Sequence, residues 1–378
     1  MSFIMNIRSV AKYESKILVR SWFFRIFTLL AVVFLGFFNF AMMLMEDNFG
    51  LWFAKSVSSN IPYLNLLLLN TGQAVVAVFL SSEFLKRDKK LDTSEVFYVR
   101  PLSNAEYVVG KIWGNLRVFL FLNLLVLAIV LAFNFMASGV TVDLPAYLVY
   151  FFLISIPTLI FIIGLSIFLM LLLKNQALTF ILLLGYIGLT LFYIQDKFYY
   201  LFDYMVYNLP LFKSTIVGFS NLELILNHRA IYFFAGLGFI FFTIFLFKRL
   251  PNARRSHYPW LFLSFCMFLL MVTAGFRHVR SILWEGEMRA LYTSINNKYV
   301  YEPKMAIDYY DISVEQKSET IRSVVGMEGT ALAASEVFIF CLNPGLRVEE
   351  VKDGEKSLNF KREEQILAVD FGRKIEKG

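Results

Sequence analysis

The chain has 378 residues, of which 58% are hydrophobic and 17% are charged, whereas an ordinary soluble domain has about 45–50% apolar and about 25% charged residues. A soluble domain of this length cannot bury the side chains of 42 Phe, 19 Tyr and 13 Met, because burial saturates as chains grow. The composition therefore excludes an ordinary soluble enzyme and predicts a membrane protein. The net charge of +7 is explained better by Lys and Arg at one face of a bilayer than by nucleic-acid binding.

The N-terminal segment, residues 1–26, mixes basic residues with apolar residues at approximately helical spacing. This pattern predicts an amphipathic helix that lies at the membrane interface. The positively charged flank of an ordinary signal anchor is the alternative. The apolar run that follows is too distant from the N-terminus and too aromatic for a cleaved signal peptide, so we expect it to be retained.

Seven apolar runs are long enough to cross a bilayer, which takes about 20 helical residues. They show no period-2 alternation, and backbone polar groups cannot stay unpaired in lipid, so each run is predicted to be a helix. The runs cover residues 27–45, 61–80, 118–137, 146–173, 177–194, 230–247 and 260–276.

The distribution of basic residues predicts the orientation of these spans. Counted over the flanks and connections, 17 Lys and Arg fall on the side of the N-terminus and 4 on the other side. Because basic residues stay in the cytoplasm, the N-terminus is expected there. Seven crossings then place everything after residue 276 outside the cell.

The connection 195–229 is aromatic-rich, but charged residues recur too often for a spanning helix: Asp196, Lys197, Asp203, Lys213 and Glu223. Short re-entrant or interfacial helices covered by protein are the first interpretation. An aromatic belt that only anchors the protein is the alternative.

Residues 277–378 have a different pattern. After a polar linker helix, apolar residues alternate over 310–314 and 367–371, and Asp353-Gly354 is a strong hairpin signal. This predicts a small extracytoplasmic β-rich segment. Since the sequence stops just after a predicted strand, we expect it to be the front part of a longer protein.

Motifs for independent chemistry are missing from the sequence. There is no phosphate loop, no HExxH and no GxSxG, and His228, His257 and His278 are scattered over different connections. Two cysteines, Cys266 and Cys341, are too few for a disulfide scaffold or a cysteine metal site. The seven runs also contain no Asp, Glu, Lys or Arg, so an ion-coupled carrier is not expected. We expect no enzyme activity and no cofactor or metal in this chain, and energy supplied by a partner.

Polar residues of the second run are candidates for a translocation path or a subunit interface: Asn65, Asn70, Thr71 and Gln73. Hydrogen bonding between helices of the bundle is the alternative. Asn39, Asn123 and Asn134 are isolated in the sequence, which favours a packing role for them.

The loop 81–111 between the second and third runs is long and carries charges of both signs. It contains Glu83 and Arg87, a predicted helix start at 91–95, and then Pro101, Ser103, Gly110 and Lys111. In this order and position it resembles the cytoplasmic loop of type-2 ABC exporter permeases. The interfacial helix, the six spans and the re-entrant segment agree with that family over about 250 residues.

The resemblance implies a six-span permease domain at 27–250. Such permeases often finish after six spans, whereas this chain departs from them by adding a cytoplasmic connection and seventh span at 251–276 and the β-rich segment. The fold class is thus an all-α polytopic protein of the bacterial inner membrane with a small β-rich C-terminal segment. Two such halves, from a second copy or a paralogue, would form the transport unit. A separate ABC subunit would bind ATP and Mg²⁺ and contact the loop. The residues implied in that coupling are Glu83, Arg87, Leu91, Asp92, Val96, Phe97, Pro101, Ser103, Tyr107 and Lys111.

The segment 341–348 and the hairpin after it are similar to the opening β-domain of gluzincin aminopeptidases, and bacterial permeases fused to such a module exist. The zinc motif is absent from this sequence, so no peptidase activity is assigned. The alternative function is a membrane anchor for an extracytoplasmic enzyme whose catalytic part lies beyond residue 378.

Overall fold

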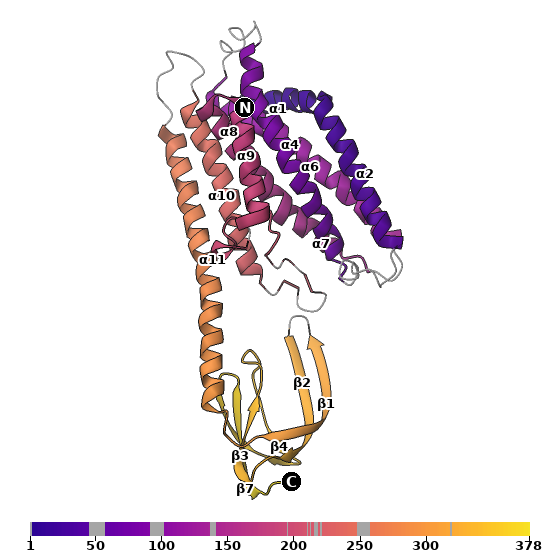
Figure 1. Ribbon diagram of the computed structural model, residues 1–378, viewed down its shortest axis with the longest axis vertical. Coiled ribbons are helices and arrows are strands. Elements are labelled where there is room, and N and C mark those ends of the chain that lie inside the picture. The colour runs from indigo at the N-terminus through magenta and orange to yellow at the C-terminus, as the bar shows by residue number, and fades with distance from the viewer. Residues whose placement is uncertain are drawn as a thin grey trace. The chain divides into compact units, whose positions relative to one another are not determined.

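The computed structural model describes residues 2–44, 57–90, 102–136, 141–194, 196–209, 211, 213–214, 218–219, 221–247, 258–317 and 320–378. The chain divides into two compact units, Met1–Val279 and Arg280–Gly378. The first unit is helical and the second is mainly β (Figure 1).

The helical unit contains α-helices, two five-residue π-helices and one 3-10 turn. In chain order they are α1 (Ser2–Arg20), α2 (Trp22–Leu44), α4 (Asn60–Lys90), α6 (Asn104–Met136), α7 (Leu144–Tyr150), η1 (Phe151–Ser155), α8 (Ile156–Leu173), α9 (Gln176–Leu189), η2 (Thr190–Ile194), η3 (Phe198–Tyr200), α10 (Leu222–Leu246) and α11 (Tyr258–Lys298).

Seven helical segments of the described residues are long and apolar enough to cross a membrane, which confirms the seven predicted runs in number and order. Their ends extend further than predicted. α6 begins 14 residues before the third run, α10 begins 8 residues before the sixth, and α11 continues without a break to Lys298, so the predicted linker helix is part of it. The apolar pattern missed these ends because it stops at charged residues, whereas the helices continue where other side chains meet those charges.

α1 and α2 are separated at Ser21, and α1 packs along the first half of α6. Two glycines permit the close approach. A Cβ at Gly110 would lie 2.7 Å from Val10 Cβ, and one at Gly114 would lie 2.7 Å from Glu14 Cβ. Small residues at the contact let helices approach at backbone distance, as in other membrane helix pairs.

α8 and α10 also cross at backbone distance. A Cβ at Gly164 would lie 2.6 Å from the carbonyl oxygen of Gly236, and one at Gly236 would lie 2.7 Å from the backbone of Ile160. The glycines are required here because any side chain would push the two helices apart.

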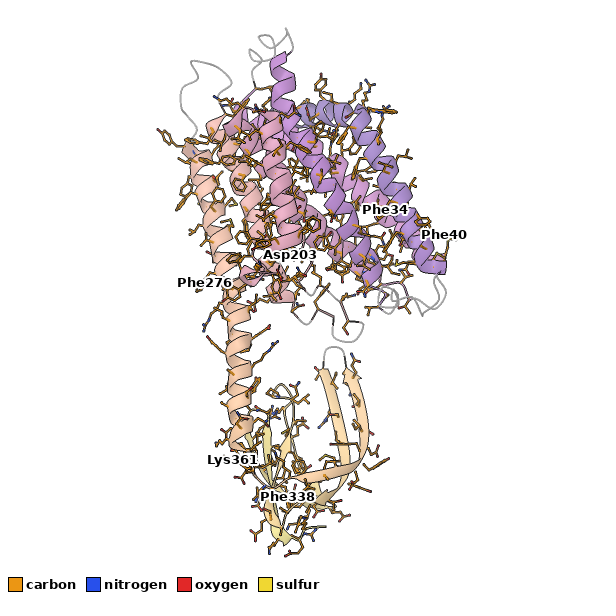
Figure 2. All side chains as sticks on the ribbon, viewed as in Figure 1. Phe34, Phe40, Asp203, Phe276, Phe338 and Lys361 are labelled. Carbon is orange, nitrogen blue, oxygen red and sulfur yellow. The ribbon has the colours of Figure 1, made fainter. Side chains whose placement is uncertain are left out.

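The connection 195–229 differs from the short helices that we expected. Its described residues form the 3-10 turn η3, further turns and one β-bridge between Ser214 and Gly218, and α10 already begins at Leu222. The side chains of Tyr204, Met205 and Val206 are nevertheless buried. We call residues 196–211 the plug segment; Figure 2 marks its Asp203.

The second unit contains the last turns of α11 and two larger β-structures. β1 (Met305–Lys317) and β2 (Thr320–Ala331) form an antiparallel ribbon, and the three-stranded sheet has the order β3 (Ser335–Cys341), β7 (Ile366–Ile375), β6 (Asn359–Glu363). The predicted hairpin is present as β4 (Lys352–Asp353) and β5 (Lys356–Ser357), but Gly354 (φ +60°) and Glu355 form its turn. The β-rich segment predicted for this part of the chain is therefore confirmed.

The core of the second unit is small. Ile295 of α11 packs with Ile339 and Ile366 of the sheet, and Phe338 is fully buried (Figure 2). By contrast, one face of the β1–β2 ribbon carries apolar side chains that remain exposed: Tyr310, Ile312, Val314, Ile321, Val325 and Met327.

Candidate functional site

The predicted coupling loop lies between the end of α4 and the start of α6. α4 remains helical through Lys90, so Glu83 and Arg87 lie on its last two turns. Ser103, Tyr107 and Lys111 lie at the start of α6. The other predicted coupling residues are outside the described residues: Leu91, Asp92, Val96, Phe97 and Pro101.

A reciprocal capping box begins α6. The backbone N–H of Ser103 donates to the Glu106 carboxylate (2.6 Å), and the backbone N–H of Glu106 donates to Ser103 Oγ (3.1 Å). Asn6 of α1 donates to the other Glu106 oxygen at 2.9 Å. These bonds satisfy N–H groups that have no partner within the helix. Ser103 and Glu106 therefore fix the residue at which α6 begins, and Glu106 also ties this end of α6 to α1.

The start of α6 is also fastened to the end of α10. Asn104 donates to the carbonyl oxygen of Phe247 at 2.7 Å, and the Tyr107 ring stacks on the Phe247 ring with centroids 5.4 Å apart. Tyr107 is fully buried. The start of α6 is therefore in contact with both α1 and the end of α10.

A buried ion pair joins α1 and α6. Lys111 Nζ lies 3.3 Å from Glu14 Oε2, and both side chains are at most 4% exposed. Beside them Ser15 donates to the Gly114 carbonyl oxygen (2.6 Å) and Arg117 donates to Ser15 Oγ (2.6 Å). Because the ion pair is desolvated, removing one of its two charges would break a buried contact at a high cost in stability. We call this contact the α1–α6 clamp.

The burial of Tyr107 and Lys111 changes the interpretation of the coupling residues. Both contact other helices of their own chain, so any effect that they have on a partner acts through the placement of those helices. The predicted apolar runs contain no charged residues, but the longer helices that include these runs do. Lys111 in α6 and Arg229 in α10 are both buried.

A cluster of uncharged polar side chains lies between α4, α6 and the π-helix η1. Asn70 donates to Asn123 Oδ1 (2.9 Å), Asn123 donates to Gln73 Oε1 (2.8 Å), and Ser155 donates to Asn123 Oδ1 (2.8 Å). All four side chains are fully buried. Two buried atoms at the edge of the cluster, Asn70 Oδ1 and Gln73 Nε2, have no hydrogen-bond partner.

The asparagines that we interpreted as isolated have partners on neighbouring elements. Asn123 is the centre of the polar cluster, Asn39 of α2 and Asn65 of α4 bond to each other at 2.7 and 3.1 Å, and Asn134 bonds to Tyr147. Thr71 contacts Tyr207 of the plug segment at 2.5 Å. Spacing along one helix cannot reveal these partners, because they come from elements far apart in the sequence.

Arg229 stabilises the irregular backbone around η1. Pro157 has no N–H, so it cannot donate to the carbonyl group of Leu153 one turn earlier. Arg229 Nε donates to that carbonyl oxygen at 2.6 Å, and its Nη atoms donate to Tyr204 O (2.9 Å) and Thr158 Oγ1 (2.8 Å). The fully buried guanidinium thus joins α10, η1 and the plug segment. The sequence placed Arg229 on an external connection, because α10 begins earlier than its apolar run.

Three consecutive residues of the plug segment, Phe198, Tyr199 and Tyr200, have left-handed backbone angles (φ 52°, 58° and 62°). Residues other than glycine have a strained backbone in this left-handed conformation. His278 bonds to the carbonyl oxygen of Tyr199 (2.8 Å) and His228 to that of Tyr200 (3.0 Å). The two imidazole rings lie 5.1 Å apart. The sequence suggested that these two histidines are scattered over different connections, but the structure brings them together.

Asp203 orders the rest of the plug segment. Its carboxylate accepts hydrogen bonds from the backbone N–H groups of Tyr207 (2.9 Å) and Asn208 (2.8 Å). Burial raises the pKa of Asp203, although these bonds and the nearby Arg229 oppose that effect.

Among the described residues, no group of three or more His, Cys, Asp or Glu side chains could hold a metal ion. No model of a known protein family matches the chain, and no curated protein matches it. The interpretation of the site therefore depends on its own geometry.

Proposed function

We propose that this chain is the transmembrane permease subunit of an ATP-driven ABC exporter in a bacterial inner membrane. The observation that carries the proposal is the way the start of α6 is held, immediately after the loop 91–101 in the sequence. This start is capped and is bonded to α1 and to the end of α10. A loop that merely joined two spans would not need this attachment.

The proposed mechanism is a rigid-body movement of helices. ATP-dependent closure of the partner subunits would press on the loop, where the apolar side chains of Leu91, Val96 and Phe97 would contact the partner. The capping box and the clamp would pass the displacement to α6 and α1, and the stacked Tyr107 would pass it to α10. Coupled elements of this kind move as discrete packed bodies.

The polar cluster has a structural role in this mechanism. Asn70, Gln73 and Asn123 bond within one copy of the chain, which supports hydrogen bonding between helices rather than a surface between subunits. The bonds would keep α4, α6 and η1 together while they move. In membrane proteins such bonds contribute about 0.6 kcal/mol each on average.

Co-purification tests the transport function. The full chain is extracted from its native membrane in a mild detergent, and we expect a stoichiometric subunit with a phosphate loop and ATPase activity. Replacing two loop residues, Val96→Asp with Phe97→Asp, is expected to lose that subunit, whereas the control Tyr301→Asp, at a residue 98% exposed in the second unit, retains it. An intact chain that purifies without any ATPase would refute the proposal.

The second candidate function is a membrane anchor for an extracytoplasmic enzyme. The observation that favours it is the second unit, which packs on the end of α11 through Ile295 and through the Lys298–Glu363 ion pair (2.9 Å). An anchor needs no ATP-binding partner. Co-purification therefore separates the two functions directly.

A further inference from the structure

The two sides of α1 differ sharply in chemistry. Its packing side, formed by Ala11, Glu14, Ser15 and Leu18, is buried, and through it α1 contacts α6. Its other side carries four exposed basic residues at every fourth position: Arg8, Lys12, Lys16 and Arg20. At 1.5 Å per residue, these cations form a row about 18 Å long. We call it the α1 basic row.

Among the described residues, no acidic side chain pairs with the charges of this row. Glu14 is the one acidic residue of α1, and it is buried beside Lys111. In the part of the chain that the structure describes, none of the four basic side chains forms an ion pair. Exposed like charges at this spacing repel one another and attract anions.

Exposed apolar residues adjoin the row. Ile4, Met5 and Tyr13 of α1 and Trp22, the first residue of α2, are each more than 60% exposed. Trp and Tyr gather at membrane interfaces, and an amphipathic helix with basic and large apolar residues is typical of binding in the headgroup region. An acidic protein would suit the charges but would leave these apolar side chains without a matching environment.

We infer that the α1 basic row binds the headgroups of anionic phospholipids. Lys and Arg side chains near an anionic leaflet are attracted to it. The row lies next to the first apolar helix, since only Ser21 separates Arg20 from α2. The inference requires the membrane location of the proposed function but neither the transport activity nor the ATP-binding subunit.

The test compares two lipids on the full chain in a neutral detergent. We expect phosphatidylglycerol to raise the melting temperature several degrees more than phosphatidylcholine, and 0.5 M NaCl to reduce that difference. In the variant Arg8→Gln/Lys12→Gln/Lys16→Gln/Arg20→Gln the difference is expected to disappear. The matched control removes two Arg and two Lys from the second unit, Arg289→Gln/Arg347→Gln/Lys361→Gln/Lys377→Gln, all at exposed positions, and is expected to retain it.

Several outcomes would overturn the inference. Equal shifts with both lipids in the unmodified chain would show no selectivity for anions. Equal losses in the row variant and the control would assign the effect to net charge alone. Retained lipid selectivity in a row variant that loses its ATP-binding subunit would assign the row to an acidic protein instead. If the fourfold variant does not fold, Lys12→Gln/Lys16→Gln is expected to halve the difference.

Discussion

The two units of the chain place polar and apolar side chains in opposite ways. The helical unit buries Asn70, Asn123 and the Glu14–Lys111 pair, and it exposes large apolar residues such as Phe37. The β unit has two small apolar clusters and leaves the apolar face of its ribbon exposed. The same exposed apolar surface therefore has a different meaning in each unit.

In the helical unit, lipid would cover the exposed apolar surface. Lipid tails are as apolar as Leu, so the hydrophobic effect cannot bring the helices together, and close packing and buried hydrogen bonds must do so. The polar interior and the paired glycines fit this requirement. In the β unit the ribbon would lie in water under the proposed topology, and its apolar face would be exposed to that water.

The largest expected effect tests the polar interior of the helical unit. Lys111→Met removes the Lys111 ammonium group from its buried ion pair with Glu14, and breaking such a pair costs about 3–5 kcal/mol. Thermal unfolding of the full chain in detergent measures the loss. The double variant Lys111→Met/Glu14→Leu is expected to recover most of it, and equal losses in both variants would show that the charge pair is not the cause.

A smaller effect is expected for close packing in the same unit. Gly114→Leu adds a side chain at a position where even a Cβ atom would lie 2.9 Å from the Ala11 carbonyl oxygen. Overpacking of this kind costs about 1–3 kcal/mol. The control is Gly36→Leu, because a Cβ at Gly36 meets nothing within 4 Å. Comparable melting temperatures for the two variants would contradict the close packing of α1 against α6 at Gly114.

The expected loss of stability is smaller again for a change in the polar cluster. Asn123→Leu removes the hydrogen bonds to Asn70, Gln73 and Ser155, and from measured membrane hydrogen bonds the cost is about 1–2 kcal/mol. Asn297→Leu, at an exposed position of α11, is the matched control and is expected to leave stability unchanged. A more stable Asn123→Leu protein would mean that the cluster is retained for function at the expense of stability.

The smallest effect is expected on the β1–β2 ribbon. Ile312→Ser with Val325→Ser removes two cross-strand apolar side chains that are 57% and 43% exposed, and surface changes of this kind stay within about 0.5 kcal/mol each. Hydrogen exchange of the ribbon in the full chain measures the change. A loss as large as that of Asn123→Leu would show that another layer covers this face, and the contrast between the units would then narrow.

The sequence predicts the fold of the helical unit well at the level of elements. The seven candidate membrane spans of the described residues were all predicted, because twenty apolar residues have few alternatives to a spanning helix. Their ends were missed where charged residues such as Lys111 and Arg229 are buried. One signal was available, since Ser103 and Glu106 stand three apart, as a capping box requires.

The contacts of the candidate site could not be predicted in the same way. Asn70 and Gln73 were visible as polar residues in an apolar run, but their partner Asn123 is 53 residues from Asn70. The left-handed turn at Tyr199 was also invisible, because aromatic residues rarely adopt that conformation. His228 and His278 meet at this turn only through the packing of α10 and α11.

The crossing of α8 and α10 at Gly164 and Gly236 restricts how these helices can move. Two backbones in direct contact cannot slide past each other, since the bulky side chains of the next turns would collide at the crossing. The two helices can still change their crossing angle, and they then rotate about a pivot, the point where the two glycines are in contact. Closing the helices on one side of the pivot opens them on the other, and the movement grows with distance from it. Under the proposed mechanism, a displacement at the Leu246 end of α10 would therefore appear with the opposite direction at its Leu222 end.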